Sequence, residues 1–476
     1  MKDTVLQKLR WDKTGPLPGF DAVSVPPEVS TRYAVLKSAI QEGGLPRPPS
    51  PMTVADETRF LLKAVAEVEH ALLVQYLYAA YSIPKTGAPA VVSAHHRRLI
   101  TIAVEEMGHL ITAQNLLMAL GAPTHFDRDD TVLGKKSAGE YPFHIRFEPL
   151  SPDSLAKYVT AESPPIDRIE DPALRARVEP VFERAEQSAG RVINHVGVLF
   201  AYVFWLFQPN DDPHPGWPEL PALMPPGLHL ADADFDFSSE PRQAMPEEFG
   251  ADDNVHVFSI LSRDDALHAL DKIAEQGEGW NIGSASHFER FLDCYERFED
   301  ELSGHILNIP TDPTTSCGGN GPETEESCIS HEAALQWARL LNVRYRLVLL
   351  ELGLAMLRPR ESDDDSLLSR PALIDASLTE MRHVVRYIAI RLTGLPRRPE
   401  GSTGEVAAAP FELPDISFPN DEAGIRQGIR EALIEAGQLM ERLRQLPPPH
   451  EPSTADLSFI GNLEASDNSL VEAIGS

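Results

Sequence analysis

The chain has 476 residues, and its 72 Asp and Glu outnumber its 42 Lys and Arg, which gives a net charge of −30. Apolar residues make up 42% of the chain and the mean hydropathy is −0.22, a composition typical of soluble proteins large enough for two or three domains. A chain this acidic repels nucleic acid and anionic membrane surfaces, so we expect neither as a partner. No run approaches about 18 uninterrupted apolar residues, so we expect no membrane span.

The cysteine content and the N-terminal residues indicate in which cellular compartment we expect the protein. Cys294, Cys317 and Cys328 are too few and too odd in number for a disulfide framework, and they fit a reducing cytoplasm. Two thiols without a nearby pair of histidines do not make a zinc site. The residues after Met1 lack the long apolar core of a signal peptide, so we expect a cytoplasmic protein.

Residues 1–52 are predicted to be an irregular N-terminal arm, rich in proline and with a short helix over 31–41. The first strong helix is predicted over 54–82, where Thr53 is a suitable N-cap and Pro84 lies just past the end. The middle of this helix is apolar nearly all round, which is typical of a central helix rather than a peripheral one.

Glu69 is expected to point inward from this helix, because it shares a face with Leu62 and Tyr76. A buried carboxylate needs a partner, since an unpaired buried charge is costly. A metal ion is one such partner, and a hydrogen bond from Tyr76 or Arg97 is the alternative. The neighbouring His70 is more readily explained as a core histidine than as a ligand.

A loop over 83–91 returns the chain into a second helix, predicted over 92–120 and followed by a glycine and a proline that end it. Glu106 and His109 are three residues apart, so both side chains lie on one face of this helix, which is otherwise apolar. In a helical hairpin Glu106 lies at the same depth as Glu69. A Glu-x-x-His pair in this setting is the arrangement that di-iron and di-manganese carboxylate bundles use.

Glu-x-x-His spacing also arises by chance, so the pattern alone is weak evidence for a metal. Three such pairs occur, at Glu67/His70, Glu106/His109 and Glu380/His383. Glu351 and Glu380/His383 could form a second set. However, the arginines at 382, 386 and 391 crowd that helix and favour a structural salt bridge.

Apolar periodicity predicts further helices over 151–162, 180–207, 263–277, 286–303, 330–357, 371–393 and 420–446. Glu278 and His287 flank a short link between two of them, where their side chains can converge. Residues 308–330 are predicted to be a linker and 331–446 a C-terminal helical region that packs on the preceding bundle. We expect a flexible tail over 447–476.

Three motifs follow one another along the chain: Ala64–Ala71 with Tyr76–Ser82, Glu105–Leu110 with Asn115–Gly121, and Glu275–Gly279 with Ser286–Phe291. This ordered set resembles the ferritin-like domain family, including the ferritin-like portion of iminophenyl-pyruvate dimer synthase of violacein- and rebeccamycin-type bisindole biosynthesis. The resemblance covers about residues 54–305. It implies a mainly α fold, with a ferritin-like four-helix bundle over 53–307, long proline-rich connections and an additional C-terminal helical region.

Carried over by position, the resemblance implies the metal ligands Glu69, Glu106, His109, Glu278 and His287, of which the first three also serve catalysis. One departure stands out. Family members often carry a Gly-Glu segment in the third helix, whereas here Gly190 is followed by Arg191. A glutamate ligand is therefore missing at this place, or Glu186 replaces it.

Two functions are compatible with these residues. The first is a non-haem dinuclear metal oxidase or oxygenase that uses two iron ions, or manganese, and O₂ on a small, amino-acid-derived or other metabolite of secondary metabolism. The second is a non-catalytic ferritin-like protein that binds metal or acts as a scaffold. The expected partners are a small-molecule substrate and O₂, and a homo-oligomer is compatible with the sequence.

Overall fold

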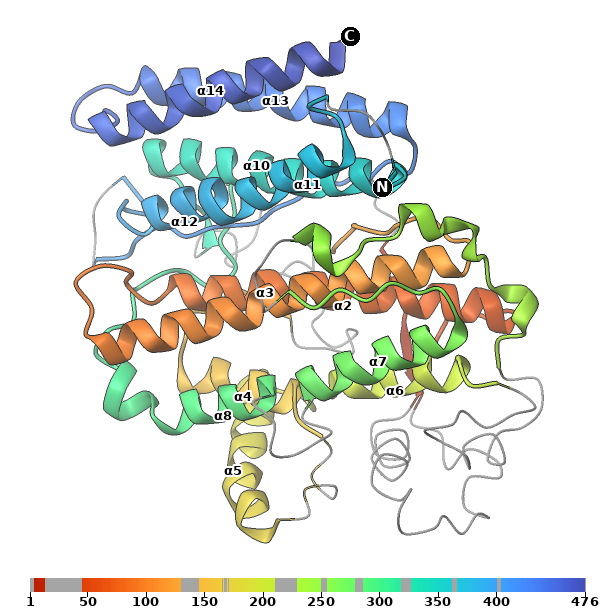
Figure 1. Ribbon diagram of the computed structural model, residues 1–476. Helices are drawn as coiled ribbons and strands as arrows, with labels where there is room; N and C mark the ends of the chain where they lie inside the picture. The colour runs from red at the N-terminus through yellow and green to blue at the C-terminus, as the bar shows by residue number, and fades with distance from the viewer. Residues whose placement is uncertain are drawn as a thin grey trace.

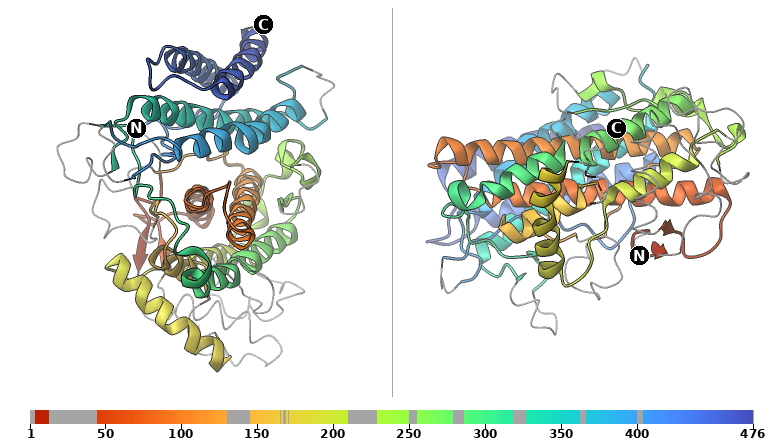
Figure 2. Two further views of the ribbon diagram at one scale, coloured as in Figure 1. Left: turned by 90° about the vertical axis from the view of Figure 1, so that its left-hand side faces the viewer. Right: turned by 90° about the horizontal axis from the view of Figure 1, so that it is seen from below.

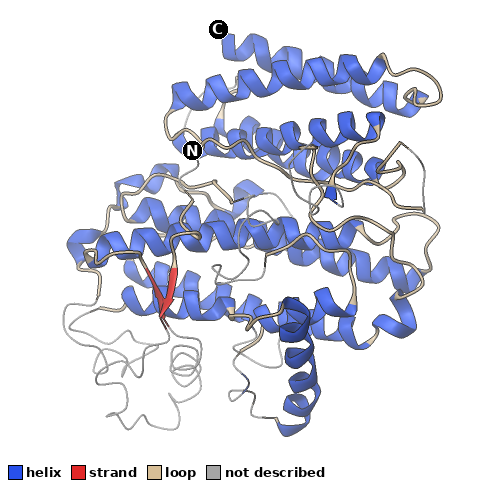
Figure 3. Ribbon diagram, turned by 180° about the vertical axis from the view of Figure 1, so that it is seen from behind, coloured by secondary structure: helices blue, strands red, loops and turns tan. Residues whose placement is uncertain are grey.

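The computed structural model describes residues 4–12, 45–129, 145–164, 166, 169, 171–209, 229–249, 255–278, 286–317, 327–361, 366–399 and 404–475. Most of these residues are helical (Figure 3). Within the described part, the two strands β1 (Arg10–Asp12) and β2 (Leu45–Arg47) pair antiparallel in one small sheet. The predicted mainly α fold is confirmed, while the helix predicted over 31–41 lies outside the described residues.

The centre of the molecule is an antiparallel pair of long helices, α2 (Val54–Tyr81) and α3 (Ala90–Ala119) (Figure 1). The Thr53 side chain caps α2 by accepting a hydrogen bond from the backbone N–H of Asp56, as its position predicts. Almost the whole of α2 is buried, which matches its apolar circumference. At the same end of the pair, Gly121 follows the C-cap Leu120 of α3 and takes a left-handed conformation, with φ of 67°.

Five shorter helices lie on one side of this pair or extend from it (Figure 1). They are α4 (Pro152–Ala161), α5 (Pro172–Ala189), α6 (Val196–Leu206), α7 (Arg263–Glu278) and α8 (His287–Glu296). The helix α5 projects away from the pair, whereas α4 packs on α8 and α6 packs on α7. The same part of the chain also contains the short 3₁₀ helices η4 (Asp232–Asp234), η5 (Phe237–Arg242) and η6 (Pro246–Phe249). A π-helical segment, η7 (Phe298–Leu302), follows α8.

The single helix predicted over 180–207 is wrong, because the chain breaks there into α5 and α6. Gly190 adopts a left-handed conformation, with φ of 67°, and ends α5. His195 is extended and precedes the first residue of α6. The two pieces also meet different surroundings, since α5 is largely exposed and every residue of α6 is buried.

Further helices lie over the α2–α3 pair in two successive layers (Figure 1 and Figure 2). The layer next to the pair contains α10 (Glu332–Leu357), α11 (Arg370–Thr379), the π-helical η8 (Glu380–Val385) and α12 (Arg386–Leu392). Beyond it lie α13 (Glu422–Arg444), which packs on α10, and α14 (Thr454–Gly475). Because η8 joins α11 directly to α12, the helix predicted over 371–393 is present with one π-helical segment inside it. The helices α10 to α13 form the C-terminal helical region expected from the sequence.

The end of the chain differs from the expected flexible tail over 447–476, because most of it forms α14. Ile460 and Leu463 are buried, and α14 packs on α13. Two carboxylates fix it further: Asp456 accepts hydrogen bonds from Arg391, and Asp467 accepts them from Arg344. The arginine partners of these two carboxylates lie far back in the chain, so local periodicity did not reveal how this segment is held.

The beginning of the chain is also more firmly held than the predicted surface arm. Val5, Leu6 and Leu9 are buried. The backbone N–H groups of Val5 and Leu6 donate to the buried carboxylate of Glu67 at 2.7 and 2.9 Å. His125 lies 2.8 Å from the same carboxylate, so Glu67 anchors this segment. The division of the chain at 52, 307, 330 and 446 stays a prediction.

Two further features bear on the sequence analysis. Cys317 and Cys328 form a disulfide with their Cα atoms 5.5 Å apart, a pairing that the count of three cysteines did not suggest. Cys294 is a buried free thiol. Among the described helices, none has both the length and the apolarity needed to cross a membrane.

Candidate metal centre

Five acidic and histidine side chains from four helical elements meet beside the α2–α3 pair. They are Glu69 of α2, Glu106 and His109 of α3, Glu162 at the end of α4, and His287 at the start of α8. Each is at most 2% exposed. Charged groups this deeply buried are paired or bind metal, because their desolvation is otherwise too costly.

These side chains form two groups that share Glu106. In the first, Nδ1 of His109 lies 3.0 Å from Oε2 of Glu106 and 3.3 Å from Oε2 of Glu69. In the second, Nδ1 of His287 lies 2.8 Å from Oε1 of Glu106 and 3.8 Å from Oε2 of Glu162. The candidate ligand atoms within each group lie within 4.8 Å of one another. Glu106 therefore directs one carboxylate oxygen into each group.

Close packing against α3 positions the segment that leads into α7. A Cβ atom on Gly108 would lie 2.6 Å from the backbone oxygen of His256, so the glycine lets an extended segment pass against α3. The hydroxyl of Thr112 accepts the N–H of Phe258, and the side chain of Asn115 donates to the carbonyl of Phe258. These contacts fix the segment that leads into α7, which packs on α3 next to the cluster.

Partners outside the cluster orient both imidazoles with Nδ1 facing inward. Nε2 of His109 lies 3.1 Å from Oε1 of Gln276 on α7. Nε2 of His287 lies 3.0 Å from Oε2 of Glu105, which also accepts a hydrogen bond from Arg290. A histidine that donates its outer N–H in this way presents the other ring nitrogen to a metal in a fixed direction.

Tyr76 secures the remaining carboxylate, because its hydroxyl donates to Oε1 of Glu162. Its ring is packed against Tyr158 and Phe291, with centroid distances of 5.1 and 4.7 Å. The sequence alternative in which Tyr76 pairs with Glu69 is therefore not what the structure shows; Glu69 instead contacts His109. Gly277 borders the same place, since a Cβ there would lie 3.3 Å from Oε2 of Glu162.

Burial and mutual contacts shift the pKa values of these side chains so that the cluster retains protons. Burial, together with the charge of Glu106, raises the pKa of Glu69 well above its ordinary value. Burial also acts to raise the pKa of Glu106, but His287 and His109 outweigh it and hold that pKa well below the usual range. Burial tends to lower the pKa of His109, yet its bonds to Glu106 and Glu69 raise it to about 10. A bound metal would displace these protons.

A further observation, on Glu106 and His287, agrees with a metal ion at this cluster. Oε1 of Glu106 and Nδ1 of His287 are both fully buried and 2.8 Å apart, yet neither makes a hydrogen bond of acceptable geometry with any described residue. Buried polar atoms normally make hydrogen bonds, so two that make none are available to coordinate a cation. Carboxylate oxygens and imidazole nitrogens are also the donors that iron and manganese take.

The structure brings together four of the five ligands predicted from sequence, Glu69, Glu106, His109 and His287. Glu278 ends α7, one residue after Gly277, but its side chain lies outside the described residues, so its role stays a prediction. Glu162 was not among the candidate ligands predicted from sequence, because it has no partner at helical spacing. Only its place at the end of a predicted helix could have drawn attention to it.

The third-helix departure has a structural counterpart. Arg191 follows Gly190 in the break between α5 and α6, and Glu186 is exposed on α5. Glu162, rather than Glu186, supplies the further buried carboxylate of the cluster.

The other two Glu-x-x-His pairs have structural partners. His70 lies 2.5 Å from the hydroxyl of Tyr345, while Glu67 anchors the N-terminal segment. Glu380 forms a buried ion pair with Arg344, and His383 is exposed. The structural alternative is therefore confirmed for Glu380/His383, although its partner comes from α10 rather than from the arginines of its own helix.

Comparison with known proteins adds two relatives and a family. Residues 62–296 match the family model described as ferritin-like. The chain is 25% identical over 447 residues to 2-imino-3-(indol-3-yl)propanoate dimerase of Chromobacterium violaceum, a match that covers 85% of this chain and 38% of that protein. It is 26% identical over 412 residues to dichlorochromopyrrolate synthase of Lentzea aerocolonigenes, covering 76% and 36%. The matches thus span less than two fifths of each relative's length. No solved structure gives a significant match.

Proposed function

Residues 62–296 belong to the ferritin-like family, and we propose that this domain holds a dinuclear metal centre, with two iron ions or alternatively manganese, in an oxidative enzyme of secondary metabolism. The observation that carries the proposal is the shared position of Glu106 between two buried ligand groups. A carboxylate between two such groups suits a pair of cations, because it offers one oxygen to each. Both relatives carry the names of biosynthetic enzymes, which agrees with an enzymatic role.

Each side chain has a distinct part in this proposal. Glu69 and His109 would hold one ion, Glu162 and His287 would hold the other, and Glu106 has an oxygen available to each group. When bound, two ferrous ions would supply the electrons that reduce O₂.

The residues around the ligands keep this site ordered and dry. Tyr76 keeps Glu162 in place, and Glu105 keeps the ring of His287 oriented. Because every one of these side chains is buried, the cluster excludes bulk water from the reacting ions.

The proposed substrate is a small metabolite derived from an amino acid. One relative is named for an indole-bearing imino acid, and the other for a dichlorochromopyrrolate. At about 25% identity, and with the matches covering less than two fifths of each relative, the particular substrate does not carry over to this chain. We therefore propose the class of compound and not the relatives' reactions.

Oxygen consumption separates the enzyme from a metal-binding scaffold. Protein loaded with Fe²⁺ under nitrogen and then mixed with O₂ is expected to consume O₂ faster than the same concentration of free Fe²⁺, with a transient near-ultraviolet or visible absorption band. Glu162→Gln should slow this reaction at least roughly tenfold, because it removes a negative ligand from one group. Exposed Glu186→Gln is the matched control and should leave the rate unchanged. Iron that binds without faster O₂ consumption would favour the scaffold.

A further inference from the structure

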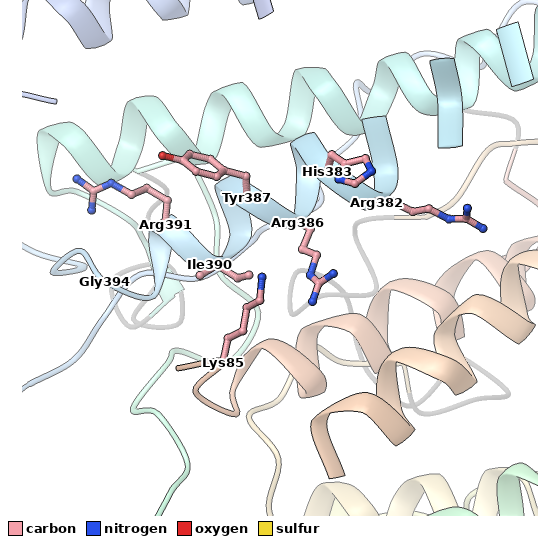
Figure 4. Close-up of a pocket in the computed structure, with 8 residues that line it drawn as sticks. All are labelled: Lys85, Arg382, His383, Arg386, Tyr387, Ile390, Arg391 and Gly394. Atoms are coloured by element: carbon pink, nitrogen blue, oxygen red, sulfur yellow. The ribbon is translucent and has the colours of Figure 1, made fainter. Parts of the chain in front are cut away.

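A second feature of the molecule lies away from the metal centre, where the turn after α2 meets α12. A cavity of about 450 Å³ opens there (Figure 4). Its lining residues, called here the basic pocket, are Lys85, Arg382, His383, Arg386, Tyr387, Ile390, Arg391 and Gly394. Along α2, Tyr81 lies about 18 Å from Glu69 at the helical rise, so a ligand in the basic pocket would not touch the metal centre.

The lining is strongly cationic in a chain whose net charge is −30. Its described residues include three arginines and a lysine but no Asp or Glu. Arg382, Arg386 and Ile390 follow one another at intervals of four, so one side of η8 and α12 presents guanidinium groups next to an apolar side chain. Lys85 reaches toward Arg386 from the opposite wall (Figure 4).

Among the described residues, one of these guanidinium groups has an acidic partner, while another has a buried N–H donor that makes no hydrogen bond. Arg391 donates to Asp456, 3.0 Å away on α14, so its charge is offset. By contrast, Nε of Arg386 is fully buried and has no hydrogen-bond partner among the described residues. Burial lowers the pKa of Lys85, and the nearby charge of Arg386 lowers it further. A buried guanidinium donor facing a second cation calls for an anion between them.

We propose that the basic pocket binds a small organic anion that carries a phosphate or pyrophosphate group. Phosphate oxygens accept from guanidinium forks and from a lysine ammonium at once, and their multiple charge matches Lys85 and Arg386 on opposite walls. Tyr387 and Ile390 provide apolar surface for the organic part of the ligand. The cavity volume lies in the range of about 300–1,000 Å³ that is typical of small-molecule sites.

Calorimetric titration of the full chain with pyrophosphate, at constant ionic strength and without added metal, tests this proposal. One saturable site per chain is expected. Arg386→Met and Lys85→Met should each weaken binding roughly tenfold or more, because each removes a charged hydrogen bond. Arg426→Met is the control, since Arg426 pairs with Glu422 on α13, outside the basic pocket, and should leave binding unchanged. Circular dichroism of each variant checks that it is folded.

Three results would overturn the proposal. The first is the absence of saturable binding to the parent chain, and the second is equal binding by the parent and Arg386→Met. The third is citrate binding as tightly as pyrophosphate, which would exclude a phosphate-specific site. Because no iron is present in the titration, these outcomes do not depend on whether the metal centre is catalytic.

Discussion

Glu106→Ala is expected to remove both metal ions from the iron-loaded protein, whereas Glu69→Ala and Glu162→Ala should each lower the content from two ions toward one. The reason is that Glu106 directs one oxygen into each ligand group, while Glu69 and Glu162 each contribute to a single group. Elemental analysis after iron loading and desalting measures the number of ions per chain directly.

The control for this series is Glu186→Ala, which removes an exposed glutamate of the same domain and should leave the metal content unchanged. Circular dichroism checks that each variant keeps its helices, because alanine also leaves a buried space. Adding His109→Ala to Glu106→Ala should remove whatever metal the single variant retains. If that double variant binds as much iron as the parent chain, Glu106 and His109 are structural residues.

Arg344→Met is expected to lower the free energy of unfolding by about 3–5 kcal/mol, the cost of leaving buried carboxylates without their cation. Arg344 is 1% exposed and donates to both oxygens of Asp467, at 2.7 and 2.9 Å, and to Glu380 at 2.9 Å. These bonds join α10 to η8 and to α14. Urea unfolding of the parent and the variant, followed by circular dichroism, measures the difference.

Two further variants show whether this loss comes from the buried charges. Arg426→Met breaks a surface pair with Glu422 and should cost at most about 0.5 kcal/mol. The triple variant Arg344→Met, Glu380→Gln, Asp467→Asn removes the charges together and should recover much of the loss. A triple variant less stable than Arg344→Met would contradict the electrostatic explanation.

The stability contributed by the buried carboxylates around Arg344 should depend on pH in a defined direction. Burial, with repulsion from Glu380, raises the pKa of Glu351 well above its ordinary value, and burial raises those of Glu380 and Asp467. The folded chain therefore holds protons that the unfolded chain releases, so the contribution to stability falls as pH rises above the ordinary range of a carboxyl. The loss in Arg344→Met should accordingly be larger at pH 8 than near pH 5.

Sequence predicted the part of the candidate metal centre that two neighbouring helices carry. Glu69, Glu106 and His109 lie on α2 and α3, which are long, strongly apolar and joined by a short loop, so helical periodicity fixes their faces and the hairpin fixes their depths. Glu162 lies at the end of a ten-residue helix, and its place depends on how α4 packs on α8. No local pattern encodes that packing.

The same distinction explains the helices that were predicted incorrectly. One helix was predicted across Gly190, but the left-handed conformation of this glycine ends α5. Only the different burial of α5 and α6 shows why the chain breaks there. The helix α14 is held by Asp456 and Asp467, whose arginine partners lie 65 and 123 residues earlier in the chain. Interactions over such separations depend on the tertiary fold and are not visible in local periodicity.

Anomalous diffraction from crystals of the iron-loaded protein, recorded at the iron absorption edge, tests the dinuclear centre most directly. The expected result is two peaks on opposite sides of the Glu106 carboxylate, one beside Glu69 and His109 and the other beside Glu162 and His287. Crystals whose iron peaks all lie outside this cluster would contradict the central claim, and a single peak beside Glu106 would contradict a dinuclear centre.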